Sequence, residues 1–169
     1  MLFRSLIYAD AQDTVVEGGA GSDRVIVQGK DGIELDMAKA SVERVDGGVG
    51  DDWIDASGAK TAATILGNNG DDKIAGGEAN DYLHGGDGND SLAGNAGNDR
   101  LHGGTGDDLF TFGEGHGSDY VNGGAGASWT DTVQLDGGMT LGTLGTDWTL
   151  KVTQGSITDQ DANSVSLSN

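Results

Sequence analysis

The chain has 169 residues, of which 32 are glycine and only 5% are aromatic, so a globular core built from large side chains is not expected. Repetition is the usual way in which such a composition still folds. The 9 basic residues are outnumbered by 28 acidic ones, and the net charge of −19 argues against nucleic acid as a partner, because phosphate binding needs a basic surface.

Residues 1–17 are expected to form an N-terminal extension ahead of the first repeat. The opening MLFRSLIYAD has one basic residue and a short apolar patch without a small-residue cleavage site, which makes it a poor signal peptide. No apolar run approaches the roughly 20 residues that a membrane-spanning helix requires. The chain has no cysteine, so neither disulfides nor a thiolate metal site is available.

Residues 18–66 are expected to form irregular coils with partial repeats. Two units, GGAGSDRVI and GGVGDDWID, share a glycine-rich start and an aspartate in sixth place, Asp23 and Asp52. A third, degenerate unit has Ala63 in that place. The segments RVIVQ, IELDM and SVERV alternate like strands with looser turns, which indicates wider coils that cap the N-terminal end.

Residues 67–111 hold five consecutive nonapeptides: GNNGDDKIA, GGEANDYLH, GGDGNDSLA, GNAGNDRLH and GGTGDDLFT. A sixth unit follows after two inserted residues. Counted from the first glycine, position 6 of these units is always aspartate: Asp72, Asp81, Asp90, Asp99, Asp108 and Asp119. Position 8 is always apolar: Ile74, Leu83, Leu92, Leu101, Phe110 and Val121.

Each nonapeptide predicts one turn and one short strand. Its first six residues are mostly Gly, Asn and Asp, and glycine, followed by asparagine, accepts the positive φ values of turns. Asn68 and Asn95 fit this rule at position 2, whereas Ala79 at position 4 breaks it and predicts a strained or weaker turn. The last three residues alternate like a strand with one inward side chain. Two nonapeptides therefore make one coil, and the expected fold is all-β: a right-handed parallel β-roll with looser β caps at both ends.

The regular roll is expected to span 67–131, although the unit GGAGASWTD at its end has Ser128 in place of the aspartate. Residues 132–169 change to alternating strands with glycine-rich turns, and Trp148 is a candidate anchor there. This segment is expected to be a C-terminal β cap, because an open coil exposes its core and an unpaired strand edge. Since SVSLSN stops in mid-pattern, we expect the cap to be truncated and the chain to be part of a longer protein.

Like positions of successive coils in such a roll lie one strand spacing apart, about 4.8 Å. The aspartates would line the two edges alternately: Asp72, Asp90 and Asp108 on one, Asp81, Asp99 and Asp119 on the other. Carboxylates about 5 Å apart repel by roughly 3 kcal/mol at an effective dielectric constant near 20. Ca²⁺ relieves this repulsion, since two oxygen ligands about 2.4 Å from the ion on opposite sides match the coil spacing. Mg²⁺ fits less well, because its bonds are shorter and its octahedral shell is rigid.

The pattern GGxGxDxUx, with U apolar, resembles the calcium-binding nonapeptide of RTX (repeats-in-toxin, hemolysin-type) proteins, continuously over 67–122 and with gaps over 18–131. The resemblance implies a β-roll that folds on binding several Ca²⁺ ions outside the cell, in a protein exported from a Gram-negative bacterium by type I secretion. It also implies that the position-6 residues are the metal ligands: Asp72, Asp81, Asp90, Asp99, Asp108 and Asp119, with Asp52 and Asp23 as more isolated candidates.

We therefore expect a secreted, extracellular calcium-binding module that is not an enzyme. No zincin, nucleophile-elbow or P-loop motif occurs, and a narrow roll filled by its own aliphatic side chains offers no substrate pocket. The alternative is the C-terminal repeat part of a secreted enzyme or toxin (a metalloprotease, lipase, epimerase or cytolysin) or of a bacterial surface adhesin. Calcium ions are the expected partners, and the sequence does not identify a protein partner.

Two further patterns have weaker cases. The segment DQDAN at 159–163 has the opening spacing of an EF-hand loop, but Ser164 replaces the required glycine, so a polar turn is favoured. His84 and His102 occupy position 9 two units apart and would stack on one outer face. A transition-metal pair is conceivable there, but solvent-exposed ladder residues are the more common arrangement.

Overall fold

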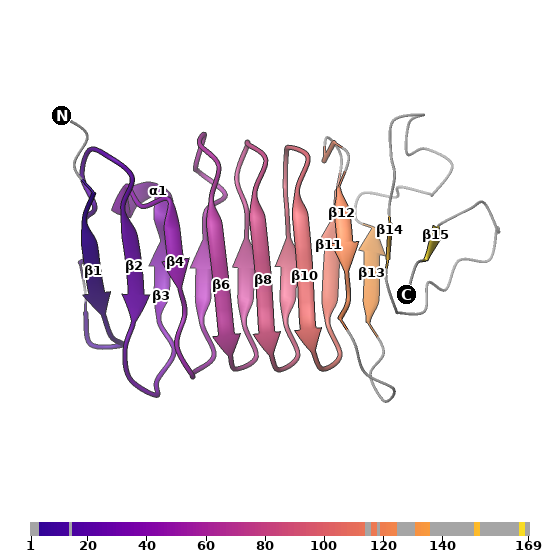
Figure 1. Cartoon of the computed structure of the whole chain (residues 1–169), viewed down its shortest axis with the longest axis horizontal. Helices are drawn as coiled ribbons and strands as arrows, with labels where there is room; N and C mark the ends of the chain where they lie inside the picture. The colour runs from indigo at the N-terminus through magenta and orange to yellow at the C-terminus, as the bar shows by residue number, and fades with distance from the viewer. Residues whose placement is uncertain are drawn as a thin grey trace.

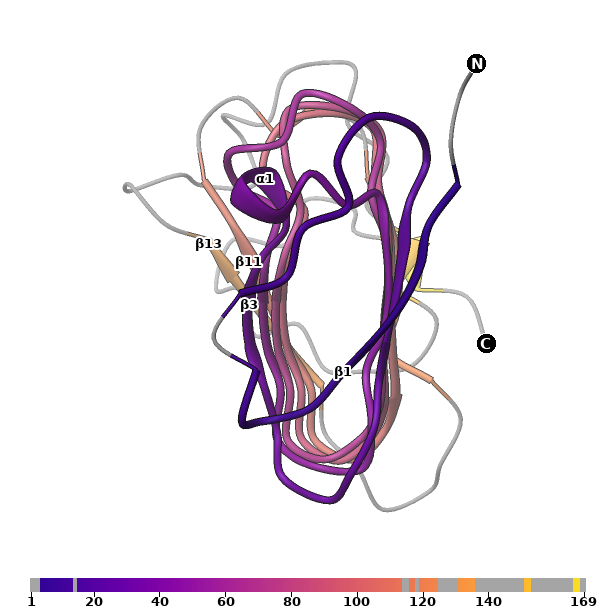
Figure 2. The same cartoon turned by 90° about the vertical axis from the view of Figure 1, so that its left-hand side faces the viewer.

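The computed structural model describes residues 4–13, 15–113, 116–117, 119–124 and 131–135, together with the backbone of 151–152 and 166–167. The strands wind into a parallel β-roll with two facing sheets (Figure 1). Viewed along its axis, the roll is a flattened oval, with the two sheets as its long sides (Figure 2). The predicted all-β parallel roll is confirmed.

Successive strands alternate between the two sheets. The nine-stranded sheet contains, in spatial order, β1 (Leu6–Ala9), β2 (Arg24–Val27), β4 (Arg44–Asp46), β6 (Thr64–Asn69), β8 (Tyr82–Asp87), β10 (Arg100–Thr105), β12 (Tyr120–Asn122), β14 (Lys151–Val152) and β15 (Ser166–Leu167). The six-stranded sheet contains, in spatial order, β13 (Thr132–Leu135), β11 (Leu109–Phe112), β9 (Ser91–Ala93), β7 (Lys73–Ala75), β5 (Trp53–Asp55) and β3 (Glu34–Asp36).

The core consists of two facing stacks of position-8 side chains or their equivalents. The stack in the six-stranded sheet is Ile54, Ile74, Leu92 and Phe110. The stack in the nine-stranded sheet is Val25, Val45, Ile65, Leu83, Leu101 and Val121. All of them are at most 1% exposed. Burying each such side chain contributes about 1.5–3 kcal/mol, so these stacks supply the apolar stabilisation of the roll.

The N-terminal coils have longer turns than the regular ones. Arg24 pairs with Arg44, 20 residues further on, whereas Tyr82 pairs with Arg100, 18 residues further on. A short helix, α1 (Met37–Ala40), lies in the turn between β3 and β4 and accommodates the extra residues. Strand β1 pairs in parallel with β2, so residues 6–9 add an edge strand to the nine-stranded sheet.

Two turn predictions have different outcomes. Asn68 and Asn95 have positive φ values of 78° and 64°, as predicted. Their side-chain amides donate hydrogen bonds to the carbonyl oxygens of Gly47 and Gly76, which tie each turn to the neighbouring coil. The predicted strain at Ala79 is wrong, because this residue does not have a positive φ and so avoids the left-handed region.

Several of the sequence predictions fall on other parts of the chain. Ser128, Trp148 and the EF-hand-like segment 159–163 lie outside the described residues. Within the described part, no helix is long and apolar enough to cross a membrane.

Candidate metal centres

The lower edge of the roll in Figure 1 is formed by the turns that lead into the six-stranded sheet. Five aspartates line it in chain order: Asp52, Asp72, Asp90, Asp108 and Asp131. The backbone N–H of each of the first four aspartates donates a hydrogen bond to Oδ1 of the next aspartate. The distance is 2.8 Å from Asp72 to Asp90 and 2.9 Å from Asp90 to Asp108. These carboxylates therefore join successive coils through the backbone.

The upper edge is formed by the turns that lead into the nine-stranded sheet, and its ladder has a gap. Asp81 N–H donates to Asp99 Oδ1 at 2.7 Å, and Asp99 N–H donates to Asp119 Oδ1 at 2.8 Å. Ala63 N–H donates to Asp81 Oδ1 at 2.7 Å but supplies no carboxylate of its own. The regular ladder of the upper edge therefore ends at Ala63.

Asp131 is an edge residue that the fixed nine-residue count missed. Asp108 N–H donates to Asp131 Oδ1 at 3.1 Å, and Val133 pairs with Phe110 in the neighbouring coil. The expectation that this unit lacks an aspartate is therefore wrong, because Asp131, three residues beyond Ser128 in the sequence, supplies the carboxylate. The signal was present in the sequence, since Asp131 precedes the apolar Val133 by two residues, as position 6 precedes position 8.

Glu43 is the second edge residue that the sequence analysis missed. Asp23 N–H donates to Glu43 Oε2 at 2.8 Å, so the glutamate takes the place that aspartate has in the regular coils. Glu43 also precedes an apolar inward residue, Val45, by two positions. Asp23, the isolated candidate, is thus part of a carboxylate pair at the N-terminal end of the upper edge.

The second carboxylate oxygen, Oδ2, determines what these edges can bind. This oxygen is buried and has no hydrogen-bond partner in six of the edge aspartates: Asp23, Asp72, Asp90, Asp99, Asp108 and Asp119. In Asp52 and Asp81, by contrast, Oδ2 accepts from Gly48 N–H at 3.0 Å and from Gly77 N–H at 2.6 Å. A buried carboxylate oxygen without a partner is costly, so the six open atoms favour binding of a cation or a proton.

The protonation of the edge aspartates reflects the same burial. Burial raises the pKa to about 7 in Asp72, Asp99 and Asp108, and to about 6 in Asp90 and Asp119. The hydrogen bonds that each receives from a backbone N–H lower the pKa but do not cancel the effect of burial. These five carboxyl groups therefore bind a proton more readily than an ordinary aspartate does.

In the five regular units, a glycine at position 1 lies against the Oδ2 of the position-6 aspartate. A Cβ on Gly67 would lie 2.0 Å from Asp72 Oδ2 and 2.6 Å from the carbonyl oxygen of Gly85 in the next coil. The position-6 Oδ2 is similarly close, at 2.0–2.5 Å, to the Cβ sites of Gly76, Gly85, Gly94 and Gly103. A side chain at position 1 would displace the carboxylate, so glycine is needed there for its small size.

This set of donors fits Ca²⁺. Calcium binds carboxylate and backbone carbonyl oxygens at about 2.3–2.6 Å in a flexible shell. Among the described residues, no three His, Asp or Glu side chains come close enough together to hold a metal ion. A metal at either edge would therefore combine few carboxylates with carbonyl oxygens of the turns, a set that suits Ca²⁺ better than metals that prefer imidazole or thiolate.

A second ladder runs along each edge at position 5. Asn89 N–H donates to Asp71 Oδ1 at 2.7 Å, and Asp107 N–H donates to Asn89 Oδ1 at 2.9 Å. On the upper edge, Asn98 N–H donates to Asn80 Oδ1 at 2.8 Å. All five regular units have Asp or Asn at position 5, and the ladder explains this restriction, because only these side chains place an Oδ1 acceptor there.

The fold and its edges define a calcium-binding repeat module: a parallel β-roll whose glycine turns present buried, stacked carboxylates. The family model of the RTX calcium-binding nonapeptide repeat (4 copies) matches residues 40–59, 62–92 and 84–117. These segments are therefore RTX calcium-binding nonapeptide repeats, as their resemblance to that family implied. No curated protein was found to match the chain.

Proposed function

We propose that the chain is the calcium-binding β-roll module of a secreted protein and that it folds on binding Ca²⁺ outside the cell. The observation that carries this proposal is the series of buried Oδ2 atoms without hydrogen-bond partners on both edges. Closing the coils takes these carboxylates out of water without giving Oδ2 a donor, so a cation is required to stabilise the closed form at neutral pH.

The proposed ligands follow the two edges. The lower edge would use Asp52, Asp72, Asp90 and Asp108, with Asp131 at its end, and the upper edge would use Asp81, Asp99 and Asp119. Asp23, beside Glu43, would serve the N-terminal end of the upper edge. When bound, Ca²⁺ supplies the positive charge and the oxygen coordination that join neighbouring turns.

The proposed coupling of folding to calcium binding has a simple thermodynamic basis. Inside the cell free Ca²⁺ is scarce, and the backbone entropy of 32 glycines together with a net charge of −19 favours the unfolded chain. Extracellular calcium modules bind with dissociation constants of about 10⁻⁴–10⁻³ M. At tenfold excess over the dissociation constant, each site contributes about 1.4 kcal/mol, and several coupled sites produce a cooperative transition.

The module itself is proposed to be non-catalytic and extracellular, whichever parent protein carries it. The inward position-8 side chains from Ile54 to Val121 are at most 1% exposed, which leaves no room for a substrate inside these coils. The acidic edges offer stacked carboxylates, but each Oδ1 of the regular ladders accepts a hydrogen bond from a backbone N–H, and the unpaired Oδ2 atoms are buried away from any substrate.

Far-ultraviolet circular dichroism in excess chelator, followed by addition of CaCl₂, tests the proposal. We expect strand signal to appear cooperatively as Ca²⁺ is added, and equal concentrations of Mg²⁺ to have little effect. Isothermal calorimetry of the same samples should show binding of several ions. Full strand signal in chelator, combined with no heat of calcium binding, would overturn the proposal.

A further inference from the structure

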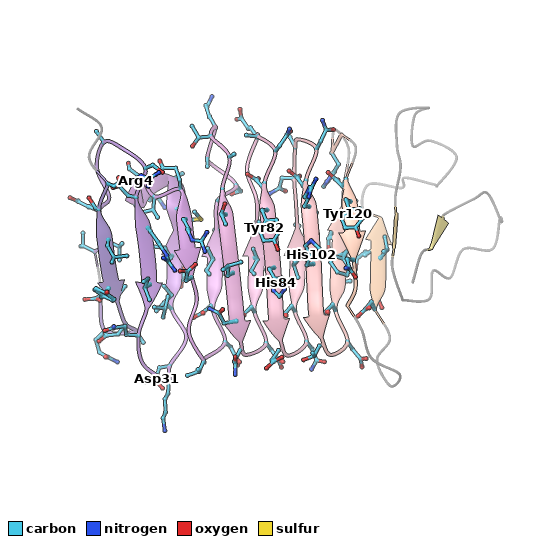
Figure 3. All side chains as sticks on the ribbon, in the orientation of Figure 1. Arg4, Asp31, Tyr82, His84, His102 and Tyr120 are labelled. Atoms are coloured by element: carbon cyan, nitrogen blue, oxygen red, sulfur yellow. The ribbon has the colours of Figure 1, made fainter. Side chains whose placement is uncertain are left out.

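His84 and His102 face each other on the outer surface of the nine-stranded sheet. His84 lies in β8 and His102 in β10, each at position 9 of its nonapeptide, and the two residues are paired in register (Figure 3). Their ring centroids are 5.9 Å apart and the ring planes differ by 22°. Tyr82 and Tyr120 pack on His102 at centroid distances of 5.5 Å and 5.8 Å, which restricts the orientation of this imidazole.

This separation suits two imidazoles that share one metal ion. Zinc binds imidazole nitrogen at about 2.0–2.1 Å, so two rings on a tetrahedral ion have centroids about 5 Å apart. The observed 5.9 Å is close to this value, but the two rings are stacked, and an ion bound by both nitrogens must lie in both ring planes. Binding therefore requires the His84 ring to rotate, since Tyr82 and Tyr120 hold the His102 ring in place. The paired strands hold both residues at one coil spacing, so little conformational entropy is lost when the second imidazole binds.

The surroundings leave both rings available. Neither imidazole takes part in a hydrogen bond or ion pair within the described part of the chain. The two rings border a hollow that Asp87 and Asn122 also line, which gives room for an ion and the water molecules that complete its shell. Ca²⁺ prefers oxygen ligands, so this pair is chemically distinct from the acidic edges.

We propose that His84 and His102 form a two-imidazole binding site for a transition-metal ion such as Zn²⁺, separate from the calcium edges. The high negative charge of the chain raises the local concentration of any divalent cation and assists its capture. The site needs the folded roll, because only the strand register brings together two histidines that are 18 residues apart.

Calorimetric titration of the full chain with Zn²⁺ in saturating Ca²⁺ tests this site while the acidic edges are occupied. We expect binding of one Zn²⁺ ion that weakens about tenfold or more in His84→Gln and in His102→Gln, because each variant loses one arm of the chelate. Ala93→Gln is the matched control, since it places the same side chain at position 9 of the other sheet. Circular dichroism in Ca²⁺ verifies that each variant folds.

A measurement on the unsubstituted chain makes the test independent of how well the variants fold. In proton NMR spectra recorded in saturating Ca²⁺, adding Zn²⁺ should shift or broaden the ring signals of His84 and His102 and leave those of His116 unchanged. The proposal would be overturned if the unsubstituted chain bound no zinc, or if Zn²⁺ affected all three histidines equally. It would also be overturned if zinc binding persisted in the variant that carries both His84→Gln and His102→Gln.

Discussion

Asp72 and Asp90 are joined by a hydrogen bond that uses only one oxygen of the second carboxylate. Asp72 N–H donates to Asp90 Oδ1 at 2.8 Å, while Asp90 Oδ2 is buried and has no hydrogen-bond partner. One oxygen thus ties two coils together and the other stays open to a cation. Substitutions that treat the two oxygens differently separate coil assembly from metal binding.

Asp90→Asn keeps the hydrogen bond between the two coils and removes the carboxylate oxygen that is open to a cation. Its Oδ1 still accepts from Asp72 N–H, while an uncharged amide group replaces the buried Oδ2. We therefore expect the calcium-free roll to become more stable and its calcium affinity to fall. Asp90→Ala removes both oxygens and leaves Asp72 N–H unsatisfied, at a cost of about 1–3 kcal/mol. The folded fraction in chelator, followed by far-ultraviolet circular dichroism, reports the stability of the calcium-free roll, and calorimetric titration measures the affinity.

Asp87→Asn is the matched control for the loss of one negative charge. Asp87 is exposed in the same repeat unit, and its Oδ1 accepts from the Thr105 hydroxyl, an interaction that asparagine retains. Little change in stability or calcium affinity is expected. Equal effects of Asp87→Asn and Asp90→Asn would assign the result to net charge and contradict the role of the buried edge.

Gly85→Ala tests the close contact at position 1. Its Cβ would lie 2.0 Å from Asp90 Oδ2, so the carboxylate must move and calcium binding at that turn should weaken. Gly19→Ala is the control: nothing lies within 4 Å of its Cβ, although its φ of 84° adds a backbone cost of about 1–2 kcal/mol. Calorimetry should show reduced affinity for Gly85→Ala alone, and an unchanged affinity in that variant would refute the steric argument.

The calcium-free roll should be more stable in mild acid than at neutral pH. Burial raises the pKa to about 7 in Asp72, Asp99 and Asp108, whereas unfolded aspartate titrates near 3.9. Between about pH 4 and pH 7 the folded chain therefore holds more protons, and its free energy of unfolding falls as pH rises through this window. The folded fraction in chelator at several pH values, followed by circular dichroism, measures this trend.

Excess Ca²⁺ should reverse the pH trend, because protons then compete with the ion for the same oxygens. Stability in calcium is expected to rise from mild acid toward neutral pH and then level off. In chelator, by contrast, a folded fraction that does not rise between about pH 8 and pH 5 would contradict the raised pKa values.

Ala63→Asp should close the gap in the upper edge. Ala63 already donates its N–H to Asp81 Oδ1 and is buried in the position-6 place, so the substitution supplies the missing carboxylate between Glu43 and Asp81. We expect one additional bound Ca²⁺, a gain of about 1.4 kcal/mol at tenfold calcium excess, and lower stability in chelator. Calorimetric stoichiometry measures the extra ion.

Ala62→Asp is the control for this gain of charge, because it changes the neighbouring exposed residue. It should add no ion of comparable affinity. The same number of ions in Ala63→Asp and in the unsubstituted chain would show that the upper edge does not bind calcium through its position-6 carboxylates.

The regular coils were predictable from sequence because each unit has an aspartate at position 6 and an apolar inward residue at position 8. Leu92 stacks between Ile74 and Phe110 as the nine-residue count predicts. The count failed at Asp131 on the lower edge, where the sequence spacing is longer, and at Glu43 on the upper edge, where a longer side chain supplies the carboxylate. Strand register is conserved across such changes because it depends on the inward apolar residue and not on turn length.

The use of the two carboxylate oxygens could not be read from sequence. Which oxygen meets a backbone N–H depends on where the neighbouring coil places its amide, as in the bond from Asp99 to Asp119. The difference between Asp90, with an open Oδ2, and Asp81, whose Oδ2 accepts from Gly77, likewise follows from the backbone path of each turn.

The ladder at position 5 gives this repeat a freedom that position 6 lacks. Asp71 and Asn89 accept the same kind of backbone hydrogen bond through the same atom, although one is charged and the other neutral. Exchange between the two residue types therefore alters the electrostatic field outside the roll while the winding of the coils is preserved. Solubility, salt tolerance and attraction of charged molecules can be adjusted at these exposed places without disturbing the scaffold beneath them.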